Sequence, residues 1–222
     1  MNFYPVFLRV AGRACVVIGG GTTGTQKVAS LIDAGAAVTV ISPTLTSELE
    51  ADVRDGAVTH HPRCYQNGDL AGAFLAYAAT SDPDVQAQIA AEAQRTGALL
   101  NVVDTPALCT FIVPSIVQRG DLVIATSTGG RSPAFAKHLR HEIEARFGPE
   151  YGVALQLLGR LRDTLAQRAL PAAERRRIFA ELLDSPLLDH LREGRLVEID
   201  RLLAASAGEG VSLASLGLEP TR

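Results

Sequence analysis

The sequence contains no uninterrupted apolar run long enough to cross a membrane, although hydrophobic residues make up 47% of its 222 positions. The first residues, Met1 to Pro5, also lack the basic segment that opens a secretory signal peptide. We therefore expect a cytoplasmic protein with no membrane partner. Its length suits one large domain, or a domain of about 150 residues with an extension.

Cysteine and lysine are both scarce. The three cysteines, Cys15, Cys64 and Cys109, are odd in number and widely spaced, which predicts buried, reduced thiols rather than a disulfide framework. Lys27 and Lys137 are the only lysines, so the basic residues are nearly all arginine. Arginine suits planar recognition of carboxylates, and the net charge of −3 argues against a general nucleic-acid-binding protein.

Glycine is concentrated in one informative stretch. An apolar run at residues 15–18 leads into Gly19, Gly21 and Gly24, and a helical pattern follows to about residue 32. In this G-x-G-x-x-G context the glycines permit a tight turn, close approach of a pyrophosphate and close helix packing. The helix start then offers N–H groups to an anion. The motif predicts dinucleotide binding, and the alternative is a glycine-rich turn without a ligand.

Strands and helices are expected to alternate over the first half of the chain. The predicted strands lie at residues 4–10, 15–18, 37–41, 58–60, 74–79 and 99–103. Helices are predicted between them, including one opened by a capping box at Ser47 and Glu50. Such alternation is typical of a Rossmann-type parallel sheet in the α/β class. The glycine loop, Ser42, Thr80 and Asp104 should share one crevice, because ligands bind beyond the carboxyl ends of such strands.

The pattern changes near residue 110. Strands at residues 111–117 and 122–126 form a predicted antiparallel hairpin, and Ser132 with Pro133 opens a helix. The chain then appears helical, and a segment rich in Gly, Ala and Ser is predicted to be loose. The predicted division is a Rossmann domain, a hairpin-helix region, a small all-helical domain and a flexible tail, at residues 1–110, 111–147, 148–205 and 206–222.

The residues after the second Rossmann strand do not encode the usual cofactor choice. Ser42, Pro43 and Thr44 stand where an acid often binds the adenosine ribose, and no arginine is there to meet a 2′-phosphate. Between NAD and NADP, we expect NAD as the cofactor. The residues expected to bind it are Gly19, Gly21, Thr22, Thr23, Gly24, Ser42, Pro43, Thr44 and Thr80.

Seven segments occur in a distinctive order over roughly residues 3–195. They are Tyr4-Pro5-Val6-Phe7, Val17-Ile18-Gly19-Gly20-Gly21 with Lys27, Ala79-Thr80-Ser81-Asp82, Asn101-Val102-Val103-Asp104, Phe111-Ile112-Val113-Pro114-Ser115-Ile116, Ser127-Thr128-Gly129-Gly130-Arg131-Ser132-Pro133 and Glu174-Arg175-Arg176-Arg177. The set resembles the precorrin-2 dehydrogenases, including the dehydrogenase and ferrochelatase part of sirohaem synthases. The third motif glycine is often alanine in that family. The chain looks like the stand-alone form, without the methyltransferase domain of larger members.

The resemblance implies an enzyme that oxidises precorrin-2 to sirohydrochlorin with NAD, a step towards sirohaem, and in some members also inserts ferrous iron. It further implies a homodimer in which the region after residue 110 exchanges elements to build the active site. Asp104 matches the family's catalytic aspartate and would accept a proton while NAD⁺ accepts the hydride. Otherwise Asp104 is an ordinary turn residue.

The implied tetrapyrrole substrate carries eight carboxylates. Thr128, Gly129 and Gly130 precede a helix and could form an anion nest, beside which Arg131 could add a bidentate contact. With Ser115 these are the expected substrate-binding residues, and the alternative is a simple loop with a solvated arginine. The arginines of residues 175–177 are interpreted as a solvated face paired with nearby acids, and a substrate role stays open.

No metal site is predicted. His60, His61 and Cys64 offer potential ligands with no second cluster to complete a tetrahedron, and His138 and His141 are interpreted as exposed helix residues. A hypothesis from a different class is an NAD(H)-sensing Rossmann module that signals through its dimer. Such a sensor would need neither a carboxylate at the cofactor crevice nor a substrate loop.

Overall fold

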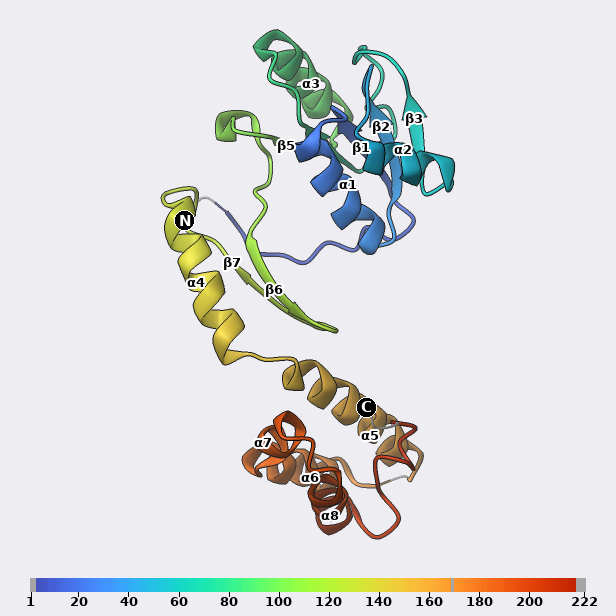
Figure 1. Ribbon diagram of the computed structural model, residues 1–222, viewed down its shortest axis with the longest axis vertical. Helices are drawn as coiled ribbons and strands as arrows, with labels where there is room; N and C mark the ends of the chain where they lie inside the picture. The colour runs from blue at the N-terminus through green and yellow to red at the C-terminus, as the bar shows by residue number, and fades with distance from the viewer. Residues whose placement is uncertain (1–2, 169, 219–222) are drawn as a thin grey trace. The chain divides into compact units, whose positions relative to one another are not determined.

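The structure, a computed structural model, describes residues 3–168 and 170–218 (Figure 1). The chain forms two compact units, Met1–Val113 and Pro114–Arg222. We refer to them as the first and second units and describe each by itself. The finer division into four regions stays a prediction.

The first unit is built on a five-stranded parallel sheet. Its strands are β1 (Ala14–Ile18), β2 (Ala37–Ile41), β3 (Val58–His61), β4 (Leu75–Ala78) and β5 (Leu99–Val102). Their order is β3-β2-β1-β4-β5, with every pair parallel, which confirms the predicted Rossmann-type sheet. From β1 the chain adds β2 and β3 on one side of the sheet and then β4 and β5 on the other, so the strand order switches between β1 and β4. Ligands of open α/β sheets bind at such a switch point, beyond the carboxyl ends of the strands.

Both faces of this sheet are covered, as a parallel sheet requires. The helices are α1 (Thr22–Asp33), α2 (Ser47–Arg54) and α3 (Pro83–Thr96), with the short 3₁₀ helix η1 at Pro106–Leu108. Val17 and Val40 point into the core under α1 and α2. Ile18 and Ala78 point into the opposite core under α3, so α1 and α3 lie on opposite faces (Figure 1).

Helix boundaries follow capping chemistry. Asp82 caps α3 by accepting N–H bonds from Asp84 and Val85, and Gly97 ends that helix at φ +75°. The expected capping box at Ser47 is wrong by one residue. The side chain of Thr46 accepts the N–H of Leu49 at 3.3 Å, which makes Ser47 the first helical residue.

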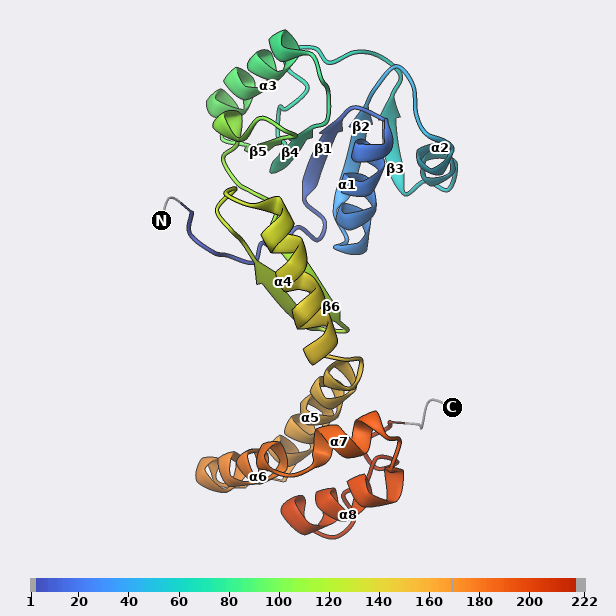
Figure 2. The same cartoon turned by 60° about the vertical axis from the view of Figure 1, so that its left-hand side comes forward.

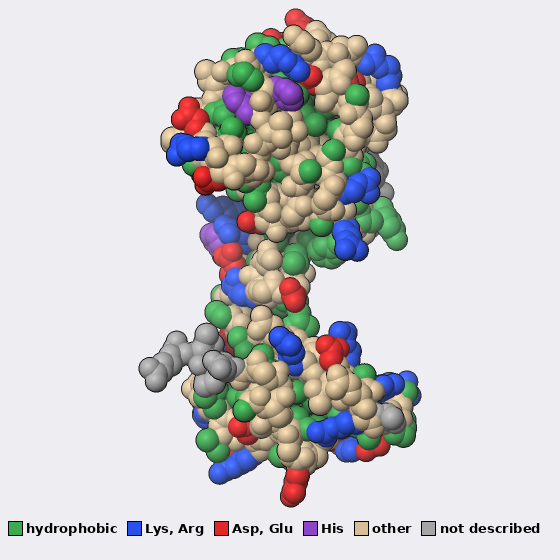
Figure 3. All heavy atoms as spheres, turned by 90° about the vertical axis from the view of Figure 1, so that its right-hand side faces the viewer, with side chains coloured by type: hydrophobic (Ala, Val, Ile, Leu, Met, Phe, Trp, Pro, Cys, Tyr) green, Lys and Arg blue, Asp and Glu red, His purple; other side chains and the backbone are tan. Residues whose placement is uncertain are grey.

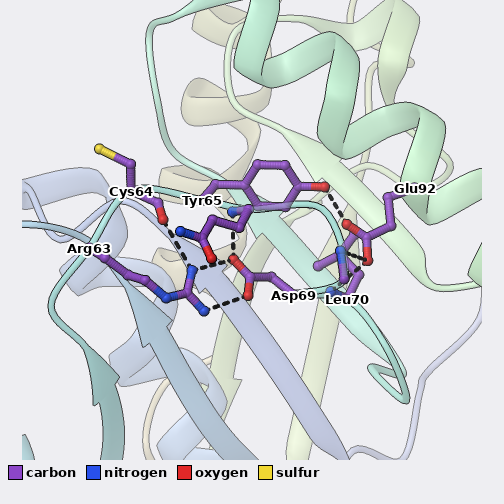
Figure 4. A network of polar contacts seen from close by, with 8 residues as sticks. Arg63, Cys64, Tyr65, Asp69, Leu70 and Glu92 are labelled. Carbon is purple, nitrogen blue, oxygen red and sulfur yellow. Dashed lines mark hydrogen bonds and ion pairs between the residues drawn. The ribbon is translucent and has the colours of Figure 1, made fainter.

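A buried carboxylate fastens the connection between β3 and β4 to α3 (Figure 4). Glu92 is 1% exposed, and its Oε1 accepts the N–H groups of Gly68 and Leu70, each at 3.0 Å. Its Oε2 accepts the hydroxyl of Tyr65, and burial together with this bond raises the pKa of Tyr65. One side chain thus satisfies three donors of a segment that has no strand or helix of its own.

Replacing Glu92 with alanine should lower the free energy of unfolding by roughly 3 kcal/mol, because three donors lose their acceptor inside the fold. Urea unfolding followed by circular dichroism measures the loss. The matched control is Gln94→Ala on the exposed side of the same helix, which should change stability by less than about 0.5 kcal/mol. A loss no larger than that of the control would show that Glu92 does not hold the connection.

The second unit begins with an antiparallel hairpin, as predicted. Its strands β6 (Ser115–Arg119) and β7 (Leu122–Thr126) turn at Gly120, which has φ +57°. Five helices follow: α4 (Pro133–Arg146), α5 (Glu150–Gln167), α6 (Ala172–Asp184), α7 (Leu187–Arg192) and α8 (Leu196–Ala207). Helices α5 to α8 lie close together (Figure 2). They enclose a core rich in leucine, which includes Leu161, Leu182 and Leu203. None of the helices within residues 3–168 and 170–218 is both long and apolar enough to cross a membrane.

An ion pair between a buried carboxylate and a half-exposed arginine ties α7 to the start of α5. Glu150 is 7% exposed, and its Oε1 accepts bonds from Nε and Nη2 of Arg192 at 3.2 and 2.9 Å. Burial raises the pKa of the Glu150 carboxyl, but backbone N–H bonds and Arg192 outweigh that effect, and the net pKa falls below the ordinary 4.5. The ionised pair therefore stabilises the fold above the unfolded-state pKa, and this stabilisation is lost as pH falls through the lower folded-state pKa.

Glu150→Gln should accordingly be less stable than the parent chain at neutral pH, with the difference shrinking once the pH drops below 4.5. Urea midpoints measured at neutral pH and in steps into the acid range give the comparison. Glu174→Gln, at an exposed position of α6, serves as the control and should show a small difference at every pH. A difference for Glu150→Gln that does not vary with pH would contradict the assignment.

Two predicted strand segments differ in the structure. Residues 4–10 form no strand within the described chain, and Tyr4 and Phe7 are 87% and 76% exposed. The first hairpin strand starts at Ser115 rather than 111, because Phe111 packs edge-on against Tyr77, with ring centroids 5.6 Å apart, in the core of the first unit.

The predictions of a loose tail and of buried cysteines also need correction. The segment predicted to be loose from residue 206 is packed as far as Leu218: Val211, Leu213 and Leu216 are buried against the core of the second unit. The tail prediction for residues 219–222 lies outside the described residues. All three cysteines are free, but only Cys15 is buried, whereas Cys109 is half-buried and Cys64 is exposed.

Candidate functional site

The glycine loop after β1 is shaped by close backbone contacts. Gly19 has φ +112°, and a Cβ there would lie 2.6 Å from the carbonyl oxygen of Ala79, the residue after β4. A Cβ on Gly24 would lie 2.0 Å from the carbonyl oxygen of Gly19. Hydrogen is the only substituent that fits at either position. The first and third motif glycines thus allow β1, β4 and α1 to approach as the sequence motif predicts.

Gly21 differs from these two glycines because it faces open space. Its φ is −80°, and an added Cβ would meet nothing within 4 Å. Gly21 is the N-cap of α1 and offers no side chain to cap the first N–H groups, which belong to Thr22, Thr23 and Gly24. An uncapped helix start in front of an open space suits a phosphate group.

The loop after β2 is fixed against the glycine loop. Thr46 donates its N–H to the carbonyl of Gly20 at 3.0 Å, and a Cβ on Gly20 would lie 2.3 Å from the carbonyl oxygen of Thr44. Ser42 is 6% exposed and donates its hydroxyl to that same Thr44 oxygen at 2.7 Å. Of the predicted cofactor residues, Ser42 therefore shapes the loop, whereas Pro43 and Thr44 stay exposed.

A shallow hollow of about 420 Å³ opens beside this loop. It is lined by Pro43, Thr44, Leu45, Glu50, Val53 and His60. The Nε2 of His60 lies 2.9 Å from the carbonyl oxygen of Ser42, so this ring bonds to the loop. Within the described residues, no group of three or more His, Cys, Asp or Glu side chains is arranged to hold a metal ion.

Asp104 occupies an unusual backbone conformation at the carboxyl end of β5. Its φ is +60°, and among the described residues no other non-glycine residue has a positive φ. This left-handed conformation costs an L-residue roughly 1–2 kcal/mol, although aspartate tolerates it better than most. Backbone strain of this kind is frequent at functional sites. The carboxylate is exposed to solvent at the sheet edge that carries the glycine loop.

Gln86 links the loops that follow β4 and β5, and sequence reasoning missed it. Its Nε2 donates to the carbonyl of Thr80 at 2.7 Å, and its Oε1 accepts the hydroxyl of Thr105 at 3.0 Å. Thr80 and Asp104, predicted to share a crevice, are thereby held at one edge of the sheet. Gln86 is 8% exposed on α3, and the only available signal was a polar residue on the otherwise largely apolar side of the helix, which also carries Glu92.

The predicted substrate residues of the second unit gather at the open end of its hairpin. Ser115 pairs with Thr126, and the loop of residues 127–132 follows directly. Of the three residues of the expected nest, Thr128, Gly129 and Gly130, only Gly129 uses its N–H in a bond within the loop. Gly129 donates to the Ser127 hydroxyl at 3.0 Å, whereas Arg131 and Ser132 donate to the carbonyl and hydroxyl oxygens of Thr128 at 3.2 and 3.3 Å.

The exposed side chain of Arg131 is the charged group that this loop offers to a carboxylate. Gly129 and Gly130 have φ +62° and +79°, so they permit the tight turn that presents this arginine. Thr128 acts from within the loop by fastening it to the start of α4.

The sheet topology, the glycine loop and the uncapped start of α1 define a dinucleotide-binding protein of the Rossmann type. Three family models match successive parts of the chain: putative NAD(P)-binding at residues 6–115, sirohaem biosynthesis protein central at 119–146, and sirohaem synthase dimerisation region at 150–206. The chain belongs to the sirohaem synthase family.

Similar proteins agree with this assignment. A siroheme synthase of Azotobacter vinelandii is 38% identical over 98% of this chain and 47% of its own length. One from Nitrosospira multiformis is 40% identical over 88% of this chain and 42% of its own length. The chain thus spans less than half the length of these relatives. The solved structure titled SirC, precorrin-2 dehydrogenase, covers 92% of this chain and 99% of itself with a TM-score of 0.79 and 24% identity, so the fold is shared.

Proposed function

We propose that the chain oxidises precorrin-2 to sirohydrochlorin with NAD as the hydride acceptor. The observation that carries the proposal is that the carboxyl ends of the strands carry both an open pyrophosphate site at Gly21 and the carboxylate of Asp104, whose backbone is strained. The printed names of the relatives, siroheme synthase, and of the similar structure, precorrin-2 dehydrogenase, support the same chemistry. We place the activity in the cytoplasm, which the three free cysteines favour.

The oxidation removes one hydride and one proton from the reduced macrocycle. NAD⁺ supplies the hydride acceptor when it is bound. The first N–H groups of α1 would hold its pyrophosphate, and Pro43, Thr44 and Thr80 would border it. The carboxylate of Asp104 would accept the proton, and the Gln86 bond network would hold the loops after β4 and β5 in place around it.

The hollow beside the loop after β2 supports NAD over NADP. Glu50 places a carboxylate there, in a hollow that Pro43 and Thr44 also line. A ribose hydroxyl can donate a hydrogen bond to a carboxylate, whereas a 2′-phosphate would be repelled by its negative charge.

We propose further that the active form is a homodimer in which the second unit exchanges elements. A two-stranded sheet is marginal by itself, and Ile116 on β6 and Phe135 on α4 are 45% and 53% exposed. Figure 3 shows further hydrophobic side chains at the surface of one face. A partner copy would cover such side chains, and the matched dimerisation region supports this assembly. Ser115 and the loop of Thr128, Gly129, Gly130 and Arg131 would then contribute to binding the tetrapyrrole carboxylates.

The experiment is anaerobic incubation of the purified protein with precorrin-2 and either NAD⁺ or NADP⁺, followed by absorbance of the reduced nucleotide. We expect NADH together with a sirohydrochlorin spectrum. Subsequent addition of ferrous iron tests metal insertion, for which Asp104 would remove pyrrole N–H protons. A folded, NAD-binding dimer that forms no reduced nucleotide would overturn the proposal in favour of an NAD(H) sensor.

A further inference from the structure

The helical part of the second unit contains a hollow that the proposed dehydrogenase chemistry does not use. Its volume is about 470 Å³. Residues of α6 at helical spacing, Arg175, Arg176 and Phe179, form one wall, and Arg162 and Asp163 of α5 form the other. Two alanines complete the lining.

This hollow holds more positive than negative charge. Three arginines line it against one acidic residue, Asp163, whose carboxylate lies 3.5 Å from Nε of Arg162. Arg175 and Arg176 form no salt bridge and no side-chain hydrogen bond with any residue in the described ranges. The adjacent Arg177 does not line the hollow, and it bonds to Glu181 at 2.5 Å. Within residues 175–177, the two arginines without an acidic partner are therefore the two that line the hollow.

We infer that this arginine hollow binds a polycarboxylate. Each guanidinium can form two parallel hydrogen bonds to one carboxylate, so two unpaired arginines side by side suit a molecule with two or more carboxylates. Phe179 and the alanines give the hollow an apolar surface for the hydrocarbon that separates those carboxylates. Inorganic phosphate has no such part. The ligand is either a free small polycarboxylate or the acidic side chains of a tetrapyrrole.

The test is isothermal titration of the full chain with tricarballylate, uroporphyrin and inorganic phosphate, for the parent protein and two variants. In the double variant R175Q/R176Q we expect polycarboxylate binding to weaken at least about tenfold, which corresponds to about 1.4 kcal/mol. The control R177Q should bind within about twofold of the parent, because its guanidinium is already paired. Both arginines lie outside the leucine-rich core, so circular dichroism melting should be unchanged in all variants.

The ligands distinguish a free polycarboxylate from the acidic side chains of a tetrapyrrole as the natural occupant of the hollow. Tricarballylate binding that the double variant loses identifies a site for free polycarboxylates, and loss confined to uroporphyrin identifies a site for tetrapyrrole side chains. Equal binding by parent and double variant, no binding of either carboxylate ligand, or phosphate binding as strong as tricarballylate would overturn the inference. None of these results depends on NADH formation, so the proposed dehydrogenase activity can fail or stand independently.

Discussion

Replacement of Asp104 by asparagine should lower the rate of precorrin-2 oxidation about a thousandfold, within the range that removal of a general base produces. The expectation follows from the position of the carboxylate, exposed at the sheet edge beside the proposed cofactor site. Asparagine keeps the size and also tolerates the φ of +60°, so the fold should be unaffected. NAD affinity, measured by titration, should stay within about twofold of the parent value.

A second substitution separates strain from chemistry. Asp104→Gly relieves the left-handed conformation and should leave the chain at least as stable as the parent, yet it should be as inactive as Asp104→Asn. Asp33→Asn, at an exposed position at the end of α1, is the control and should retain full activity. Near-normal turnover by Asp104→Asn would remove Asp104 from the mechanism and leave it as a turn residue.

Gly21→Ala should weaken NAD binding about a hundredfold, roughly 2.8 kcal/mol, because the added methyl would stand where the pyrophosphate approaches the helix start. Within the protein that methyl meets no atom within 4 Å, and the φ of −80° suits alanine. The free energy of unfolding should therefore change by less than about 1 kcal/mol. Titration with NADH fluorescence and urea unfolding measure the two effects separately.

Gly24→Ala is the informative comparison. Its Cβ would lie 2.0 Å from the carbonyl oxygen of Gly19, so this variant should lose several kcal/mol of stability along with cofactor binding. The two glycines of one motif thus have different tasks, one facing the ligand and the other the protein. If Gly21→Ala bound NAD as tightly as the parent does, the pyrophosphate would have to lie elsewhere.

Sequence patterns were sufficient where local chemistry decides the structure. The glycine spacing, Asp82 before Pro83 and Ser132 before Pro133 each act within a few residues, and the structure confirms the helix starts that they predict. Site details that depend on the conformation of a loop were not readable. The N–H of Gly129, which was expected to be free, bonds to the hydroxyl of Ser127, a matter of loop geometry rather than composition.

The errors in the fold have a similar cause. Apolar residues at 4–10 resemble a strand, but pairing needs a neighbour that the described chain does not supply. In the segment after residue 206, Val211, Leu213, Leu216 and Leu218 stand among Gly, Ala and Ser, a composition typical of loose chain. Leu213 nevertheless donates its N–H to Asp200 at 2.7 Å, and its side chain is buried. Tertiary packing, which no short window contains, determined both outcomes.

The two bonds of Gln86 limit which amino acids this position can accept. The side chain must donate to Thr80 and accept from Thr105 at the same time. An ionised glutamate cannot donate, a lysine cannot accept, and an asparagine is one methylene shorter. The link between the two loops also carries no charge that changes with acidity, so the loops beside the proposed base should keep their spacing across the whole pH range in which the protein stays folded.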